Sequence, residues 1–255
     1  MTHFIRTLFL TVILVCSMTA TASETVNVPV LTYHRFATPV TDSMTITPEL
    51  FESQLKWLKD NHYTVIPLKT LVDYLLGKGP APAPKSVVIT ADDGHKTQYT
   101  TLLPLTKKYN IPVTLFIYPS AISNASYALT WDQVQEMQKT GLFDVQGHTY
   151  WHPNFNHDKK KLSPADYEKL IDTQLNKSKA VLEKKLGTKI EILAWPFGIY
   201  NQELEDGAEK AGYIMAFSID GKDANKSFNR MAEPRYMVVQ AQGMNGFEKI
   251  FSNKQ

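Results

Sequence analysis

Short, continuous apolar runs alternate with helix-forming stretches along the chain, and this alternation is the strongest constraint on its fold. Runs such as Val87–Ile89 and Leu115–Ile117 are apolar at every position, which is typical of strands covered on both faces in a parallel sheet. Eight strands are predicted: Val28–His34, Thr64–Ile66, Ser86–Asp92, Val113–Tyr118, Asp144–His148, Ile192–Pro196, Ile214–Ser218 and Arg235–Val239.

Helix start and stop signals separate these strands. Four polar residues are placed to cap helices, namely Thr47, Thr130, Ser163 and Asn201. Glycines follow the helical stretches, as is common where helices end: Gly141, Gly187 and Gly212. Strand–helix repetition of this kind predicts an α/β fold, and about seven to eight strands indicate a distorted (β/α) barrel, TIM-like and built as a single domain.

The first 22 residues have the pattern of a secretory signal peptide. Arg6 supplies a positive charge, Leu8–Val15 is the apolar stretch, and Ala20–Ala22 is the small-residue cleavage pattern. We therefore expect residues 1–22 to be a Sec-type signal peptide and residues 23–255 to be the exported domain, periplasmic or secreted. The apolar stretch is too short for a bilayer, which needs about 20 residues, so no membrane span is expected in the mature chain.

Composition narrows the remaining alternatives. The only cysteine is Cys16, so a lipoprotein anchor competes with cleavage, but Val15 is not the small residue that such signals place before the cysteine. An uncleaved anchor is a further, equally minor alternative. The formal charge of the whole chain is +2, which gives no reason to expect a nucleic-acid partner.

Two adjacent carboxylates follow one of the predicted strands. Asp92 and Asp93, with Gly94 after them, belong to the segment Thr90–Gly94, which follows the apolar run Ser86–Ile89. Neighbouring carboxylates repel each other and cost desolvation unless something positive is close. Taken alone, this segment also fits a solvated Asp-Gly turn.

Two histidines follow another predicted strand. His148 and His152 are four residues apart, and on one helical turn their rings would point to the same side and could hold one metal ion. Taken alone, they could be surface or capping histidines. Together with a carboxylate from another strand end, they indicate an open metal site of the catalytic zinc type.

Two more strand ends carry weaker signals. In Trp195–Gly198, proline and glycine enforce a fixed loop that could direct a backbone N–H into the site, although a structural turn is the default interpretation. His34, within Tyr33–Phe36, ends the first strand. A lone histidine is more often structural, but its position at a strand end favours a place facing the same site.

These segments together resemble the polysaccharide deacetylases of carbohydrate esterase family 4, the NodB-homology domain. Thr90–Gly94 is similar to that family's Thr-Phe-Asp-Asp-Gly motif, and His148–His152 is similar to its His-Ser/Thr-x-x-His motif. Two features depart from the usual pattern: Ala194 stands where the third motif begins with arginine, and no histidine follows His157. Both departures, and the Tyr33–Phe36 segment, resemble the circularly permuted poly-N-acetylglucosamine N-deacetylase branch.

The resemblance implies hydrolytic removal of N-acetyl groups from N-acetylglucosamine units of a polysaccharide, which would be the partner of this protein. Asp93, His148 and His152 would hold a divalent metal, with zinc the expected ion, which acidifies a bound water and polarises the acetyl carbonyl. The other implied roles are general base for Asp92, oxyanion donor for the Phe197 N–H, proton donor for His34, and an orienting cation for Arg235 in place of the missing arginine.

Aromatic residues near the motifs have two interpretations. Trp151, Trp195 and Tyr200 could stack on sugar rings, and ordinary core packing explains them equally well.

Two other functions stay open on the sequence alone. A non-haem iron oxygenase also uses two histidines and one carboxylate, but its chemistry needs no second carboxylate as a base. A non-catalytic carbohydrate-binding protein with the same fold is the other alternative. Ala194 favours it, whereas the retained Asp92, His34 and metal-site histidines argue against it.

Overall fold

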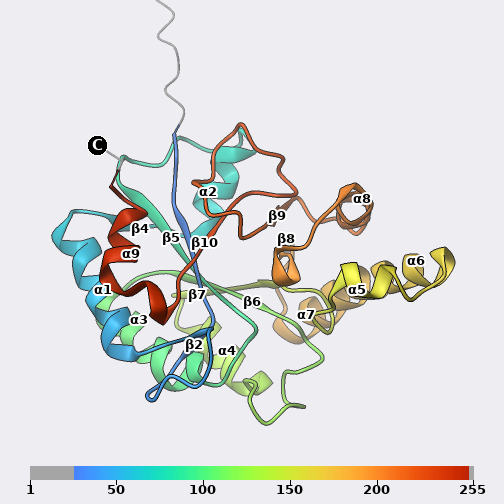
Figure 1. The fold of residues 1–255 in the computed structure, drawn as a ribbon, viewed down its shortest axis with the longest axis horizontal. Helices are drawn as coiled ribbons and strands as arrows, with labels where there is room; N and C mark the ends of the chain where they lie inside the picture. Colours follow the sequence, from blue (N-terminus) through green and yellow to red (C-terminus); the bar gives the residue numbers. More distant parts are fainter. Residues whose placement is uncertain (1–25, 253–255) are drawn as a thin grey trace, which may run out of the picture.

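The computed structural model describes residues 26–252, and the predicted signal peptide at residues 1–22 lies outside them (Figure 1). All eight predicted strands are present in the large sheet. They are β1 (Val30–Tyr33), β4 (Thr64–Val65), β5 (Ser86–Asp92), β6 (Val113–Ile117), β7 (Phe143–Gly147), β8 (Ile192–Ala194), β9 (Met215–Phe217) and β10 (Tyr236–Met237). A small second sheet pairs β2 (Arg35–Phe36) with β3 (Thr45–Ile46).

The large sheet is parallel and nearly closes on itself. Its order is β10-β1-β5-β6-β7-β8-β9, and β4 pairs with the start of β5. The chain before β10 connects the open edge: the Glu233 N–H donates to the Ala216 carbonyl, and the Ser218 N–H donates to the Glu233 carbonyl. The predicted distorted (β/α) barrel is confirmed, with all strand carboxyl ends at one rim.

Helices pack outside the strands (Figure 1). They are α1 (Pro48–Asp60), α2 (Leu68–Leu75), α3 (Leu103–Tyr109), α4 (Trp131–Lys139), α5 (Phe155–Lys159), α6 (Pro164–Asp172), α7 (Ser178–Leu186), α8 (Gln202–Lys210) and α9 (Gly243–Lys249). All four predicted caps accept a backbone N–H at the start of a helix. Within residues 26–252, no helix is both long enough and apolar enough to cross a membrane.

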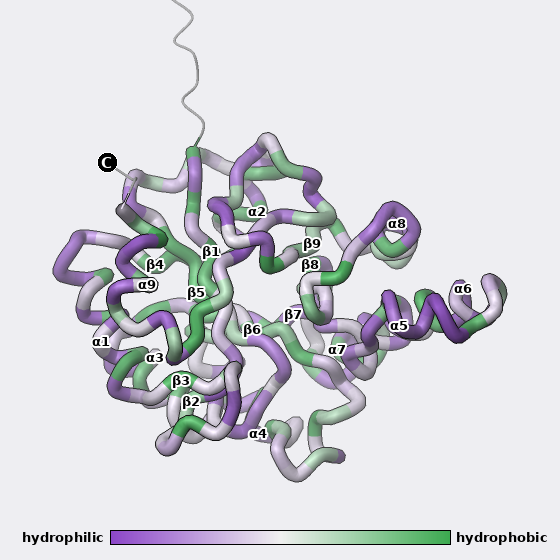
Figure 2. The backbone as a smooth tube through the Cα atoms, in the orientation of Figure 1, coloured by the Kyte–Doolittle hydropathy of each residue, from purple (hydrophilic) through white to green (hydrophobic). Residues whose placement is uncertain are grey.

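The strands supply a core on both of their faces, as their continuous apolar pattern predicted. Along β5, Val88 belongs to an inner cluster with α2, whereas Val87 and Ile89 belong to the outer cluster beneath the other helices. Figure 2 shows the apolar colour along the strands and the hydrophilic colour along α5 and α6. Burial on both faces leaves only the ends of the strands free to carry chemistry.

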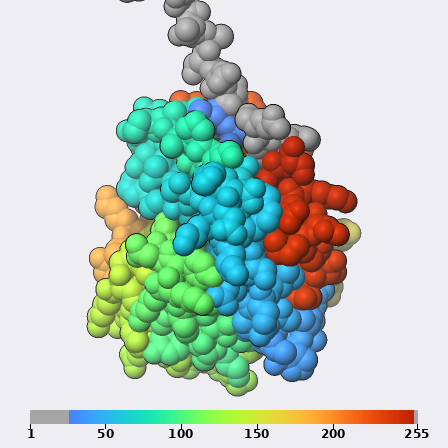
Figure 3. All heavy atoms as spheres, turned by 90° about the vertical axis from the view of Figure 1, so that its left-hand side faces the viewer, coloured from blue at the N-terminus to red at the C-terminus, as the bar shows by residue number. Residues whose placement is uncertain are grey.

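The C-terminal segment, which has little sequence pattern, forms α9 and packs beside α1 (Figure 3). The Trp57 ring lies 5.7 Å from the Phe247 ring and 5.2 Å from the Phe251 ring. Tyr63 and Phe251 lie edge to face at 4.7 Å between ring centroids. Aromatic contacts between distant segments therefore fix the end of the described chain.

Candidate active site

Asp92 ends β5 in a buried, two-point ion pair with Arg235. The two guanidinium nitrogens Nη1 and Nη2 donate to Oδ1 and Oδ2 at 2.9 and 2.8 Å. Burial alone would raise the pKa of Asp92, but Arg235, with a contribution from His148, holds that pKa well below its usual range. Asp92 is therefore ionised, and Arg235 lies where the sequence led us to expect an orienting cation.

The guanidinium is itself held on every side. Arg235 Nη1 also donates to the hydroxyls of Thr32 and Thr90 at 3.1 Å, and Nε donates to the Ser218 carbonyl at 3.1 Å. The Phe116 ring lies 5.2 Å from the guanidinium carbon. Sequence reasoning missed the two threonines, although Thr32 is the second-last residue of β1 and Thr90 is the third-last residue of β5, and a candidate residue lies at or directly after the end of each strand.

Asp93 turns away from Asp92 and faces the two histidines. Asp93 Oδ1 is 3.6 Å from the Nε2 atoms of both His148 and His152. The backbone has positive φ values of 76° at Asp93 and 70° at Gly94, so the turn begins at Asp93 itself. A Cβ on Gly94 would lie 2.9 Å from the Ile122 Cδ1 atom. Both this close approach and the positive φ favour glycine at position 94.

The loop after β7 brings the two histidines together in a way that the sequence did not reveal. Our expectation of a helical turn is wrong, because Thr149 and His152 have left-handed φ values of 63° and 59°. The loop curls back instead, and the two imidazole centroids lie 4.7 Å apart. Gln174 Oε1 accepts the N–H groups of both Tyr150 and Trp151 at 3.0 Å, which holds the curl in place.

The three side chains fit a divalent metal. The His148 Nδ1 atom is 2.8 Å from the Ala194 carbonyl, which can only accept, so Nδ1 carries the proton and the Nε2 lone pair faces Asp93. Burial and the neighbouring His148 lower the pKa of His152 to about 4. Two imidazoles and one carboxylate, whose ligand atoms lie within 4.8 Å of one another, form a donor set suited to zinc, with open coordination positions.

His34 approaches from the loop between β1 and β2. Its Nδ1 atom is buried and has no hydrogen-bond partner among residues 26–252. Burial lowers the pKa of His34 against the opposing effect of Asp92 and Asp93. Gln98 Nε2 donates to the carbonyls of His34 and Asp92 at 3.0 and 2.6 Å, so one side chain ties the two strand ends together.

The aromatic residues separate into different roles. Trp195 lines the catalytic cavity but is only 1% exposed, and its indole N–H donates to the Met231 carbonyl at 2.8 Å, so most of its ring packs in the core. Trp151 is 44% exposed and Tyr200 is 37% exposed, so both can contact a ligand. Phe197 is exposed beside the metal site, with its ring 4.5 Å from that of His152 and a left-handed φ of 57°.

One cavity of about 450 Å³ collects most of these groups at the carboxyl ends of the strands. Among its lining residues are His34, Asp92, Asp93, His148, His152 and Phe197. Arg235 lies behind Asp92, and Tyr200 lines another cavity. Tyr118 was missed: it follows β6, its ring lies 5.4 Å from that of His152, and its position after a strand was the available signal.

The chain is similar in sequence and in fold to known proteins. A family profile described as polysaccharide deacetylase matches residues 79–216, more than half of the chain. The chain belongs to the polysaccharide deacetylase family. This deacetylase is 32% identical over 198 residues to the poly-beta-1,6-N-acetyl-D-glucosamine N-deacetylase of Staphylococcus aureus strain MRSA252, a match that covers 76% of this chain and 67% of the relative.

Solved structures agree with the deacetylase fold. The Streptococcus pyogenes deacetylase PplD is 24% identical with a TM-score of 0.78, covering 89% of this chain and 98% of that one. IcaB from Ammonifex degensii is also 24% identical, with a TM-score of 0.77 and coverages of 88% and 97%. The profile match includes Asp92 and both metal-site histidines, but His34 and Arg235 lie on either side of it and reach the site only through the fold.

Proposed function

We propose that this deacetylase removes N-acetyl groups from N-acetylglucosamine units of a polysaccharide. The observation that carries the proposal is that two adjacent carboxylates have different partners. Asp92 pairs with Arg235, while Asp93 faces His148 and His152. A zinc-like ion held by Asp93 and the two histidines would supply Lewis-acid chemistry, acidifying a water and polarising the acetyl carbonyl. The Staphylococcus aureus relative is a poly-beta-1,6-N-acetyl-D-glucosamine N-deacetylase, which supports the choice of sugar.

Asp92 acts as the general base in this proposal. The ion pair with Arg235 keeps the Asp92 carboxylate ionised and directed at the cavity. The same pairing makes Asp92 a weaker base, so the main contribution of Arg235 is to orient it. The backbone N–H of Phe197 is the proposed oxyanion donor, because its loop lies beside the metal-site histidines.

His34 is the proposed proton donor to the departing amine, which leaves poorly as an anion. Its unpartnered, buried Nδ1 is what a group awaiting substrate would show. Because burial lowers the pKa of His34, the proton that it passes to the amine is proposed to come from the attacking water, by way of Asp92. Trp151, exposed at the rim of the curled loop, is proposed to contact the sugar.

The cellular setting is proposed from the sequence. Residues 1–22 would direct export, and residues 23–255 would act as one domain in the periplasm or outside the cell, where polysaccharide is accessible.

The test is acetate release from chitooligosaccharides and from β-1,6-linked N-acetylglucosamine oligomers, with and without a chelator. The proposal predicts release that stops on chelation and returns when zinc is added. Binding of the oligomers with no acetate released would support a carbohydrate-binding protein instead, and oxygen consumption would support an oxygenase.

A further inference from the structure

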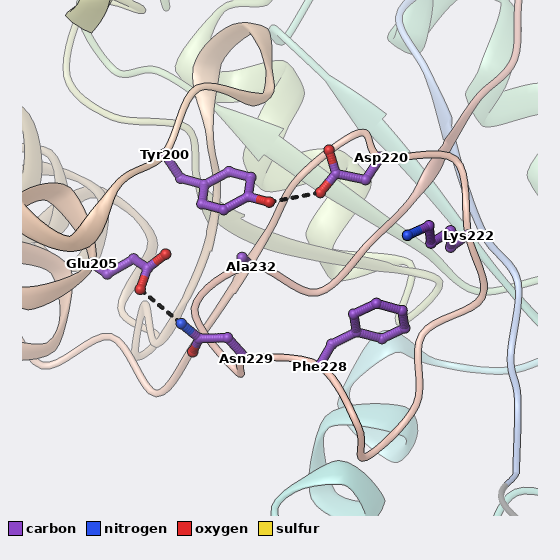
Figure 4. A pocket seen from close by; sticks show the side chains of 7 residues that line it. All are labelled: Tyr200, Glu205, Asp220, Lys222, Phe228, Asn229 and Ala232. Atoms are coloured by element: carbon purple, nitrogen blue, oxygen red, sulfur yellow. Dashed lines mark hydrogen bonds between the residues drawn. The ribbon is translucent and has the colours of Figure 1, made fainter.

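The structure contains a second cavity of about 450 Å³ (Figure 4). It is lined chiefly by Tyr200, Glu205, Asp220, Lys222, Phe228 and Asn229. Tyr200 follows β8 and Asp220 follows β9, so these two lining residues lie at the same rim of the barrel as the catalytic residues.

The two cavities share a wall. Gly198 and Ile219 line the catalytic cavity, whereas Tyr200 and Asp220, in the same two loops, line the second one. A Cβ on Gly198 would lie 2.5 Å from the Ile219 Cγ1 atom, so the loops touch at that point. The cavities therefore lie on the two sides of one loop contact, within reach of a single extended ligand.

The polar groups of the second cavity are held in place by neighbours. Asp220 Oδ2 accepts the Tyr200 hydroxyl at 2.9 Å and the Ser218 hydroxyl at 2.7 Å. Glu205, which is buried, accepts the Asn229 side-chain N–H at 2.7 Å. Figure 4 shows the Tyr200–Asp220 and Glu205–Asn229 pairs, the ring of Phe228 and the amine of Lys222 around one space.

This set of groups matches a pyranose ring. Carboxylates accept from hydroxyls, an ammonium and an amide donate, and an aromatic ring packs on the apolar C–H face of a sugar. The Lys222 Nζ atom lies 5.8 Å from the Phe228 ring centroid, which brings donor and aromatic surface together. A phosphate-bearing ligand would meet both Asp220 and Glu205, so like charges disfavour it.

We propose that this cavity is a sugar-binding subsite, which holds a pyranose unit of the same polysaccharide chain while another unit is deacetylated in the catalytic cavity. The inference rests on the proposed function and adds that the enzyme prefers oligomers long enough to reach both cavities. Occupying a second subsite makes binding of a long chain tighter without a change in the chemistry at Asp92.

The test compares Phe228→Ala and Asp220→Asn with wild type over a series of N-acetylglucosamine oligomers of increasing length. The expected result is a fall of about tenfold in kcat/KM for the longest oligomers, mainly through KM. Turnover of a monomer-sized acetyl ester should stay unchanged. Lys226→Ala is the matched control, because the Lys226 amine lies over the Tyr74 ring at 4.1 Å and does not line the cavity.

Equal losses for the small ester and the long oligomers, or no loss at any length, would overturn the subsite. Should wild type release no acetate from any oligomer, the proposed function fails, and calorimetric titration with an N-acetylglucosamine pentamer decides the subsite alone. Weaker binding by Phe228→Ala than by Lys226→Ala supports it, and equal binding contradicts it.

Discussion

Asp92 and Asp93 show how one residue step changes chemistry. Asp92 keeps the extended direction of β5 and meets Arg235 inside the barrel, whereas the positive φ at Asp93 turns its side chain toward the histidines. The motif identified both residues in the sequence. Their opposite environments depend on a backbone turn and on an arginine far along the chain, and spacing alone could not establish either.

Replacing Asp92 by asparagine keeps the shape of the side chain and removes the proposed base. We expect zinc content to stay at the wild-type level and acetate release to fall on the order of 10³-fold. Metal analysis and acetate release on the same preparation check both parts. Activity close to wild type would exclude Asp92 as the base.

Removing Arg235 leaves a buried carboxylate without its partner. We expect Arg235→Met to lower the free energy of unfolding by about 3–5 kcal/mol, because Asp92 is then charged and uncompensated. Adding Asp92→Asn to that variant should recover part of the loss, and denaturant unfolding of both variants measures the difference. Additive losses in the double variant would contradict a direct coupling.

Glu233 is a buried acid outside the reaction, and it links stability to pH. Its Oε2 atom has no hydrogen-bond partner in the described part of the chain, and burial raises its pKa to about 8. The folded state therefore keeps a proton that the unfolded state loses above about pH 4.5, so stability falls as pH rises from there to pH 8.

The matching variant is Glu233→Gln, which cannot ionise. Over that pH range we expect wild type to lose on the order of 2–4 kcal/mol relative to this variant in denaturant unfolding. Parallel curves for the two proteins would show that Glu233 is ionised throughout.

At the scale of elements, two π-helical turns position the site. Gln98–Leu102 carries the glutamine that ties His34 to Asp92, and Thr173–Lys177, between α6 and α7, carries Gln174 beneath the histidine loop. The sequence predicted both ends of the long α6–α7 segment, with Ser163 as the cap at its start and Gly187 at its end. The extra residue of a π turn has no local signature, so neither glutamine could be recognised in advance.

Gln174→Leu tests this support, because it leaves two loop N–H groups without their acceptor. We expect zinc affinity to fall about 10- to 100-fold while the fold is retained. Gln135→Leu is the control: Gln135 likewise bonds the backbone of a distant segment, but it donates to the Lys185 carbonyl, and it does so from the exposed face of α4. Equal zinc affinity in the two variants would show that the loop holds its shape without Gln174.

For the whole molecule, continuous apolar strands and capped helices were enough to predict the barrel, since β5 and β6 are buried on both faces. The segment around Glu233 that connects β9 to β10, and α9 against Trp57, depend on contacts between distant parts of the chain. Such contacts produce no periodic pattern in the sequence, so they could not be predicted from it. Trp195 illustrates the same limit, since its near-complete burial could not be inferred from the sequence around it.

The barrel matters to the proposed function because it gathers side chains from separate strand ends into one candidate metal site. Asp93, His148 and His152 come from the ends of β5 and β7, and none of the three could hold the ion alone. The direct measurement is calorimetric zinc binding to wild type, to Asp93→Ala, His148→Ala and His152→Ala, and to the control His157→Ala, whose histidine is exposed.

We predict one zinc per chain in wild type and His157→Ala, and affinity at least about 100-fold weaker in each of the other three variants. Unchanged affinity in those three, or a metal-free enzyme as active as the zinc-loaded one, would contradict the account.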